Sequence, residues 1–376
     1  MKIEPFVLER LQSTWENKVQ YNLTESGIHP YSLKELFSDK EIEEIISTRL
    51  GYCPTNGSEE LREMISHLYP DTDKDNVLVT NGSAESNFLT IWSMLNPDDE
   101  IIFMLPNYMQ MWGIARSFGI HVKPFYLKEE LHWTPDLDEI KETISSKTQM
   151  IVVCNPNNPT GAVLTEEMME EITRIAKDVN AWIYSDEIYK GAELNGKETS
   201  SFWNKFDYDK VIVNGGLSKA YALPGLRIGW MVGPKNIIEQ AWAGHDYTTI
   251  AAGSISNQIA TAVLKPQMRE KVLQRNRKIL NENLLILKKW IKKHKNLFYF
   301  IPPSAGGISF IRYNMDLNST ELSTKLRKEK SVFIVPGDCF GMDHFIRLGF
   351  GSEKDCFDKS LNLISDFLED IRKKLF

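Results

Sequence analysis

The hydrophobic pattern changes its period regularly through the first two thirds of the chain. Short apolar runs without polar alternation, which are typical of buried strands, alternate with segments whose apolar residues recur at helical spacing. The predicted strands are 76–80, 100–105, 122–126, 149–154, 181–185, 211–214 and 227–232. The predicted helices between them are 85–95, 109–118, 136–145 and 166–179. This alternation predicts an α/β fold, in which helices cover both faces of a mostly parallel sheet.

The two ends of the chain predict a second, smaller part. Residues 5–19 have the apolar spacing of an amphipathic helix, and a short strand follows them. A long helix, either straight or bent, is predicted from about 255 to 293. Both strands and helices are predicted between that helix and the C-terminus. We therefore predict a large domain over residues 45–260. A smaller α+β domain would consist of residues 1–44 together with 261–376.

Composition and charge narrow the classes of function. The chain has 376 residues, a formal net charge of -7 and one Lys-rich stretch, 288–295, which is typical of a solvated helix face, so nucleic-acid binding is not expected. The N-terminus has no apolar signal segment, and no apolar run approaches the ~20 residues of a membrane helix. The four cysteines lack metal-ligand spacing and are typical of reduced thiols. These features predict a cytoplasmic protein without a metal or membrane partner.

Residues 211–233 place a lysine between two apolar runs. The first run ends in two glycines, Ser218 and Lys219 follow at once, and Arg227 precedes the second run. A buried ammonium is costly and its pKa falls, which makes the amine nucleophilic and suits a Schiff base with an aldehyde cofactor. On this stretch alone, a lysine on a surface turn remains an equal alternative.

Polar residues also follow other predicted strands, at the edge where ligands bind in open α/β sheets. Gly82, Ser83 and Ala84 lead from the strand 76–80 directly into a helix. Close backbone approach, a hydroxyl and free N–H groups predict a phosphate site there, with an ordinary helix cap as the alternative. Tyr108 follows the next strand and could stack on a flat ring or be a core aromatic.

Two further strand ends carry a constrained loop and a carboxylate. In the loop 155–161, NPNNPTG, two X-Pro pairs hold the amide of Asn158 in a set position. Asp186 ends a buried strand and needs a partner, for which a protonated pyridine nitrogen would serve, and Tyr189 follows one turn later. Together with the lysine, these strand ends form a complete binding set for pyridoxal 5′-phosphate.

Six motifs resemble, in order and spacing, those of the class I/II aminotransferases, which are pyridoxal-phosphate enzymes of fold type I. The motifs are YCPTNGSEELREMI, NGSAE, NPNNPTG, YSDEIY, SKAYALPGLRIGW and FIRLGFG, and the resemblance covers essentially the whole chain. It implies an aspartate-aminotransferase-like fold and pyridoxal 5′-phosphate as cofactor. It further implies a ping-pong transfer of an amino group between an L-amino acid and a 2-oxo acid.

The resemblance also implies roles for individual residues. Lys219 resembles the lysine that holds the cofactor and moves the α-proton, and Asp186 resembles the partner of the pyridine nitrogen. Arg347 resembles the arginine that receives the substrate's α-carboxylate, for which a planar fork is suited. Asn158 and Tyr189 resemble the residues that bond the cofactor's phenolic oxygen, and Asn158 also faces the substrate.

The remaining roles concern the phosphate, the ring and the subunit boundary. Tyr108 resembles the aromatic that stacks on the cofactor, and Tyr52 resembles a tyrosine that reaches the phosphate in a neighbouring subunit, which implies a homodimer with shared sites. Gly27 can be placed near the substrate only loosely. The residues that resemble those binding the cofactor's phosphate in the family are Gly82, Ser83, Ala84, Ser218 and Arg227.

The chain departs from the family pattern in two places. Gly216 stands where many members have a Ser or Thr that touches the phosphate. No arginine lies between Arg227 and Arg269, although aspartate-specific members place a second arginine within the segment that corresponds to 242–256. We therefore expect aspartate to be a poor amino donor, because a second carboxylate would lack a fixed cation.

The expected substrate side chain is apolar, aromatic or cationic. In the segment 242–256, His245 is the possible cation, and Asp246 stands beside it. A cationic side chain could pair with Asp246 or Glu25, although solvated surface acids are the simpler interpretation of both. Other reactions of the same fold, namely elimination, cyclisation or oxidase chemistry, remain alternatives, as does a non-catalytic relative that binds the cofactor.

Overall fold

The computed structural model describes residues 3–375, and the side chains of residues 3–372. Its main sheet has eight strands in the order β2-β9-β8-β7-β6-β3-β4-β5. The central strands β8, β7, β6, β3 and β4 run parallel, whereas β2, β9 and β5 join the edges antiparallel. The bounds are β2 Val77–Thr80, β3 Glu100–Leu105, β4 His121–Lys128, β5 Thr134–Pro135, β6 Thr148–Cys154, β7 Trp182–Asp186, β8 Val211–Gly216 and β9 Gly229–Val232. The predicted α/β fold class is confirmed.

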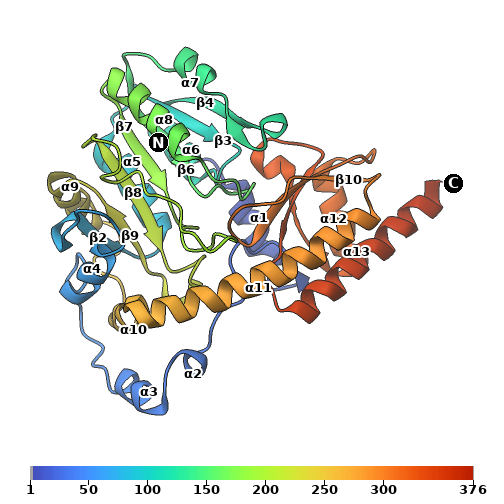
Figure 1. Ribbon diagram of the computed structural model, residues 1–376, viewed down its shortest axis with the longest axis horizontal. Coiled ribbons are helices and arrows are strands. Elements are labelled where there is room, and N and C mark those ends of the chain that lie inside the picture. The colour runs from blue at the N-terminus through green and yellow to red at the C-terminus, as the bar shows by residue number, and fades with distance from the viewer. Residues whose placement is uncertain (1–2, 376) are drawn as a thin grey trace.

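Helices cover both faces of this sheet (Figure 1). Neighbouring residues of one strand point to opposite faces, so Ile151 and Val153 of β6 enter one apolar core while Met150 and Val152 enter the other. Helix α9 was absent from the prediction, and it buries Ile237 on the second of these faces. The helices of this part are α4 Glu59–Ser66, α5 Ser83–Met94, α6 Gln110–Ser117, α7 Leu137–Thr143, α8 Glu166–Asp178, α9 Lys235–His245 and α10 Ser254–Leu264.

A smaller sheet of four antiparallel strands, β10-β11-β14-β13, forms the other part of the molecule. The N-terminal segment joins this part, because β1 pairs in parallel with β12. The elements of this part are α1 Val7–Trp15, β1 Tyr21–Asn22, β10 Phe298–Phe300, β11 Ile308–Tyr313, α12 Ser319–Lys330, β12 Val332–Phe333, β13 Val335–Pro336, β14 Phe345–Gly349 and α13 Lys354–Leu375. Helices α2 Leu33–Leu36 and α3 Asp39–Ile46 lie instead beside the large part, where α3 contacts α10 (Figure 1).

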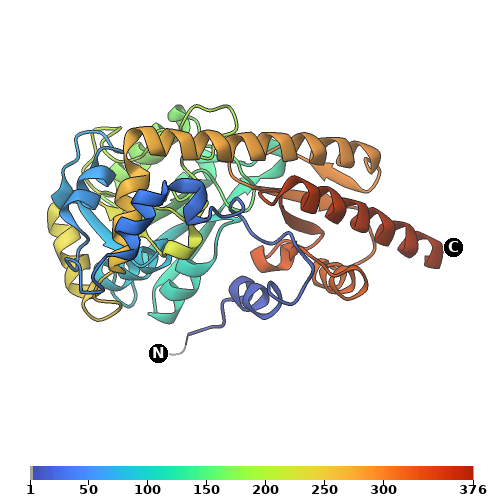
Figure 2. The ribbon, with the colours of Figure 1, turned by 90° about the horizontal axis from the view of Figure 1, so that it is seen from below.

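The long helix predicted from about 255 to 293 consists of two helices. α10 ends at Leu264 and α11, Pro266–Lys293, begins after a single intervening residue, Lys265. Pro266 lacks an amide hydrogen and has a fixed φ, so it fits the first position of a helix but not the interior. Helix α11 then spans both parts of the molecule, and Figure 2 shows α1 beneath their junction. Residues of α1 are thereby brought near the ends of the large sheet.

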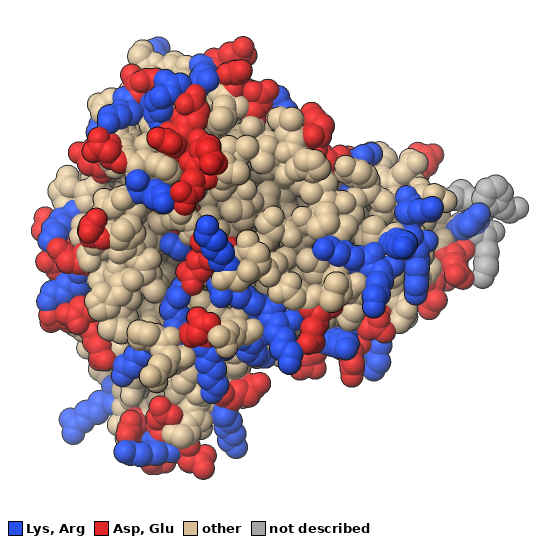
Figure 3. Space-filling model, viewed as in Figure 1, with Lys and Arg blue, Asp and Glu red and all other residues tan. Residues whose placement is uncertain are grey.

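No helix among the described residues is both long and apolar enough to cross a membrane. Within the same residues, no cluster of three or more His, Cys, Asp or Glu side chains could hold a metal ion. On the face in Figure 3, basic side chains over α11 and α13 are interspersed with acidic ones, which is typical of a solvated surface.

Candidate active site

One cavity of about 470 Å³ brings together most of the residues predicted from sequence. It lies where β6, β7 and β8 end, between the start of α5, strand β14 and helix α1. Among the predicted residues, the cavity is lined by Ser83, Ala84, Tyr108, Asn158, Asp186, Tyr189, Ser218, Lys219, Arg227 and Arg347. Gly27, Tyr52 and Gly82 are the predicted residues that do not line it.

One end of the cavity is built to hold an anion. Arg227 has a left-handed backbone, φ 53°, and its Nη1 lies 3.5 Å from the hydroxyl of Ser218. A Cβ at position 82 would meet the guanidinium of Arg227 at 2.3 Å, so only glycine lets this arginine lie against the start of α5. The first-turn N–H groups of α5, with Ser83 at its first position, have no partner within the helix. Together with the guanidinium, they form a site for a phosphate group.

The packing around Gly216 explains its departure from the family pattern. A Cβ there would lie 2.9 Å from Cδ1 of Ile188 and 3.0 Å from the carbonyl oxygen of Ile228. A hydroxyl-bearing side chain would therefore need the neighbouring backbone to shift. The hydroxyl and guanidinium groups at this end of the cavity come instead from Ser83, Ser218 and Arg227.

Asp186 is the last residue of β7 and lines the same cavity as Arg227. Burial raises the pKa of its carboxyl to about 7, although the N–H of Ile188 donates to Oδ1 at 3.1 Å and favours the charged form. A buried carboxylate in this state is stabilised by any cationic group that enters the cavity. A pyridinium N–H would be such a group.

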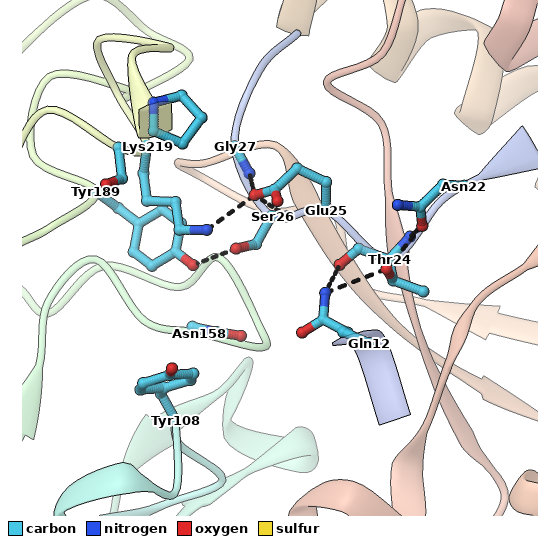
Figure 4. A network of polar contacts seen from close by, with 12 residues as sticks. Gln12, Asn22, Thr24, Glu25, Ser26, Gly27, Tyr108, Asn158, Tyr189 and Lys219 are labelled. Atoms are coloured by element: carbon cyan, nitrogen blue, oxygen red, sulfur yellow. Dashed lines mark hydrogen bonds and ion pairs between the residues drawn. The ribbon is translucent and has the colours of Figure 1, made fainter. Parts of the chain in front are cut away.

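Lys219 is already paired with a carboxylate from the N-terminal segment. Its Nζ lies 2.8 Å from Oε1 of Glu25 (Figure 4). Burial acts most strongly and lowers the pKa of the ammonium, but Glu25 and Tyr189 outweigh it, and the pKa is raised. The expectation that the pKa of Lys219 falls was wrong. The sequence could not reveal this ion pair, because Glu25 lies 194 positions away along the chain. The same ion pair lowers the pKa of Glu25 to about 2.

Arg347 on β14 is 2% exposed and presents its guanidinium to the cavity. Its Nη1 donates to Oδ1 of Asn158 at 3.0 Å, and its Nη2 donates to the carbonyl oxygen of Thr24 at 2.7 Å. Its Nε has no hydrogen-bond partner among the described residues. A buried, oriented guanidinium with a donor unused can receive a carboxylate.

The N-terminal segment anchors both tyrosines of the site. The hydroxyl of Tyr189 donates to Oγ of Ser26 at 2.8 Å, and the hydroxyl of Tyr108 donates to Oε1 of Glu9 at 2.8 Å. From this segment the sequence placed only Gly27 and Glu25 near the substrate, and it predicted the preceding helix without its contact with the cavity. The cavity residues that it missed are Phe6, Glu9, Gln12, Glu16, Ser26, Asn87, Gln110, Cys154, Ile188 and Pro224. The polar side chains on α1 were a signal, but the pattern did not indicate what they face.

The other predicted residues have clear places. Gly27 packs on the lysine loop, because a Cβ there would lie 3.2 Å from the carbonyl oxygen of Ser218. Tyr52 is 90% exposed and does not line the cavity of its own chain. His245 is fully buried and lies 3.2 Å from a carboxylate oxygen of Glu85, so it is unavailable to a substrate. Asp246 is exposed and does not line the cavity.

The family follows from comparison with known proteins. Residues 24–358 match the family model described as aminotransferase class I and II. The chain belongs to this family. Enzymes of the family depend on pyridoxal 5′-phosphate, and the chain is accordingly a pyridoxal-phosphate-dependent aminotransferase-family enzyme. The anion site, the buried Asp186 and Lys219, which all line one cavity, fit that cofactor.

Relatives of this aminotransferase-family chain carry out more than one reaction. A crystal structure of a PLP-dependent aminotransferase from Streptococcus suis is 34% identical, with a TM-score of 0.93, over 98% of this chain and 99% of that one. Capreomycidine synthase of Streptomyces vinaceus is 27% identical, over 92% of this chain and 89% of its own. An aspartate aminotransferase of Pyrococcus horikoshii is 29% identical, over 85% and 83% respectively. Membership of the family therefore leaves the reaction open.

Proposed function

We propose that this protein transfers an amino group between an L-amino acid and a 2-oxo acid by a ping-pong mechanism. The observation that carries the proposal is that one cavity holds both Lys219 and the buried guanidinium of Arg347. The lysine supplies an amine for the aldehyde of the cofactor, and the arginine supplies a fixed receptor for an α-carboxylate. An α-amino acid bound by this arginine has its Cα within the same cavity as the lysine.

The proposal assigns the cofactor contacts to residues on the large sheet. Ser83, Ala84, Ser218 and Arg227 would bind the phosphate, with Gly82 allowing the arginine to approach. Tyr108 would stack on the ring, and Asn158 and Tyr189 would bond the phenolic oxygen. Asp186 would pair with the pyridine nitrogen. When bound, pyridoxal 5′-phosphate withdraws electrons from the α-carbon through its protonated ring.

The chain's own residues would then bind the substrate and move a proton. Arg347 takes the α-carboxylate, while its bonds to Asn158 and Thr24 keep its fork in place. Lys219 holds the cofactor covalently and, once the substrate amine displaces it, carries the proton that leaves Cα. Glu25 lies 2.8 Å from the lysine Nζ, and attachment of the lysine to the cofactor would end this ion pair.

A homodimer forms part of the proposal. Tyr52 lies on a loop outside its own cavity and is 90% exposed, so a phosphate contact from it would have to be made in a second copy of the chain. Leu50 and Tyr247 are also exposed, by 81% and 82%, and could be covered by the same partner. The active species would then be a dimer with shared sites.

Separating the two half-reactions tests the proposal. The holoenzyme is mixed with one amino acid at a time, without an oxo acid, and the absorbance of the bound cofactor is followed. A transaminase releases one oxo acid per cofactor, stops, and regains its original spectrum when a 2-oxo acid is added. Elimination or cyclisation instead turns over repeatedly without an oxo-acid acceptor, and such turnover would refute transamination as the main reaction.

A further inference from the structure

The side chains of the cavity have an imbalance of charge once the cofactor contacts are assigned. Four acidic residues line it, Glu9, Glu16, Glu25 and Asp186, against the three basic residues Lys219, Arg227 and Arg347. The proposed function pairs Arg227 with the phosphate, Asp186 with the pyridine nitrogen and Arg347 with the substrate's carboxylate. It also joins Lys219 to the cofactor, which removes the lysine as the partner of Glu25. Three carboxylates are then left without a cation.

These three carboxylates lie close together on the side of the cavity formed by the N-terminal segment. Glu9 and Glu16 belong to α1 and the residue after its end, and Glu25 follows β1. Burial, followed by the nearby charges of Glu25 and Glu9, raises the pKa of Glu16. Glu9 accepts a hydrogen bond from Tyr108, and neither Glu9 nor Glu16 makes an ion pair with any described residue. We call Glu9, Gln12, Glu16 and Glu25 the acidic wall.

Gln12 adds an independent observation that points to a ligand. Its side chain is 9% exposed, and its Nε2 donates to both the carbonyl oxygen and the hydroxyl of Thr24, each at 3.1 Å. Because a carbonyl oxygen can only accept, the amide nitrogen must face Thr24 and the amide oxygen must face the other way. Figure 4 shows this oxygen turned from Thr24 toward the side of Asn158 and Tyr108. No described residue donates to it.

Carboxylates that face one cavity repel one another, and the amide oxygen of Gln12 is open to accept a hydrogen bond. A ligand that carries N–H donors and a positive charge relieves this repulsion and supplies that hydrogen bond. A guanidinium or an ammonium group satisfies these conditions, whereas a neutral or anionic side chain does not. The buried Arg347 meanwhile attracts the α-carboxylate of the same ligand.

We propose that the acidic wall binds the cationic side chain of the substrate, so that the preferred amino donor carries a guanidinium or an ammonium group. The inference rests on the proposed function, because it takes the ligand to be an α-amino acid whose carboxylate lies on Arg347. It replaces Asp246 with the acidic wall as the receptor for such a side chain, since Asp246 does not line the cavity. Aspartate is disfavoured, because the wall repels its second carboxylate.

The test compares amino acids of matched shape with the holoenzyme. L-Arginine, L-citrulline, L-lysine, L-leucine and L-aspartate are each mixed with it, and the rate and midpoint of the cofactor's absorbance change are measured. Citrulline has the shape of arginine without its charge. We expect arginine or lysine to exceed citrulline at least about tenfold in kcat/KM, mainly through KM, with the advantage shrinking at high salt. A citrulline value within about twofold of both cationic donors would overturn the proposal.

Variants locate the effect on the wall. Glu16→Gln and Glu9→Gln should each lower the ratio of arginine to citrulline at least about threefold, which is the effect of a half-exposed ion pair. Glu4→Gln is the matched control, because this carboxylate lies in the same segment but pairs with Arg116 outside the cavity. An unchanged ratio in both wall variants, or an equal loss in the control, would contradict the assignment.

A binding measurement separates this proposal from the proposed function. Calorimetry with 5-guanidinopentanoate and its neutral analogue 5-ureidopentanoate reports on the two ends of the site without any reaction at Cα. Tighter binding of the guanidino compound supports the acidic wall even if no amino acid changes the cofactor's spectrum, a result that would refute only the transaminase. If the two compounds bind equally well and leucine or aspartate reacts readily, the proposed transamination stands. The proposal that the acidic wall binds a cationic side chain is then contradicted.

Discussion

The two sides of the active-site cavity are built in different ways. The cofactor side consists of residues that directly follow strands of the large sheet, such as Ser83, Asp186 and Lys219. The substrate side consists of the acidic wall, which belongs to the N-terminal segment, and this segment is held by the pairing of β1 with β12 of the smaller part. Residues on the first side are positioned by the sheet itself. Those on the second depend on contacts between distant parts of the chain.

This difference predicts how variants on the two sides behave. Changes on the cofactor side should affect every substrate alike, because each substrate reacts on the same cofactor. Changes on the acidic wall should alter the choice among substrates and leave the reaction itself less affected. Arg347 belongs to neither set, because it receives the α-carboxylate that all amino acids share.

The largest effect is expected for Lys219→Ala. Loss of the group that holds the cofactor and moves the α-proton should reduce kcat by roughly 10⁴-fold with every amino acid. Lys235→Ala, which removes a lysine of α9 paired with Asp73 outside the cavity, is the control. Stopped-flow absorbance with a panel of amino acids measures both. Activity of the Lys219 variant within tenfold of the wild type would remove the lysine from the mechanism.

Asp186→Asn should reduce turnover by roughly 10²-fold or more while cofactor binding changes less, because an amide does not keep the pyridine ring protonated. The same variant should stabilise the cofactor-free protein at pH 8. The carboxyl has a pKa of about 7 when folded and 3.8 as its ordinary value, so the folded state binds more protons between these pH values. Stability from this group is therefore lost as pH rises from about 4 to 7.

Thermal unfolding of the cofactor-free variant and wild type at pH 4.5 and pH 8 measures this stability. The gain at pH 8 should amount to a few kcal/mol at most, and only a small difference should remain near pH 4.5. If the variant is less stable than the wild type at pH 8, burial of the ionised Asp186 carboxylate does not lower the free energy of unfolding, and the prediction is wrong.

Arg347→Lys is expected to raise KM by roughly 10²-fold for all amino acids, whatever their side chains. A lysine keeps the charge but cannot reproduce the bonds to both Asn158 and Thr24. Steady-state kinetics with arginine, leucine and aspartate measure the change. If KM rises for only one of these substrates, Arg347 recognises the side chain of that substrate and not the shared α-carboxylate.

The smallest effect is expected for Tyr52→Phe. Removal of one hydroxyl from the phosphate contact proposed across the dimer should weaken cofactor binding about tenfold. Equilibrium dialysis of the cofactor, with sedimentation to confirm an unchanged oligomeric state, measures it. An active monomer in dilute solution, or unchanged cofactor affinity, would contradict the shared site.

The sequence predicted the cofactor side in detail, because each of its residues stands beside a motif at a strand end. NPNNPTG around Asn158 and the motif around Lys219 specify both local conformation and neighbours. The partner of Lys219 was not predictable in this way, since Glu25 is 194 residues away and reaches it through tertiary packing. For the same reason the helix at residues 7–15 was predicted, but its contact with the cavity was not.

The pKa of Lys219 shows what such a contact can change. Burial alone lowers this pKa, as the apolar runs around the lysine suggest, but the carboxylate of Glu25 reverses the direction. The lysine is therefore a charged partner of Glu25 in this structure. Covalent attachment of the cofactor would end that pairing and leave the wall for the substrate.

The central claim is that Lys219 carries the cofactor. Borohydride reduction of the holoenzyme, followed by proteolysis and peptide mass mapping, tests it most directly, because reduction fixes the cofactor to the lysine that holds it. The account predicts the added pyridoxyl mass on the peptide that contains Lys219 and on no other lysine. Finding that mass on a different lysine, or on none while the cofactor is bound, would contradict it.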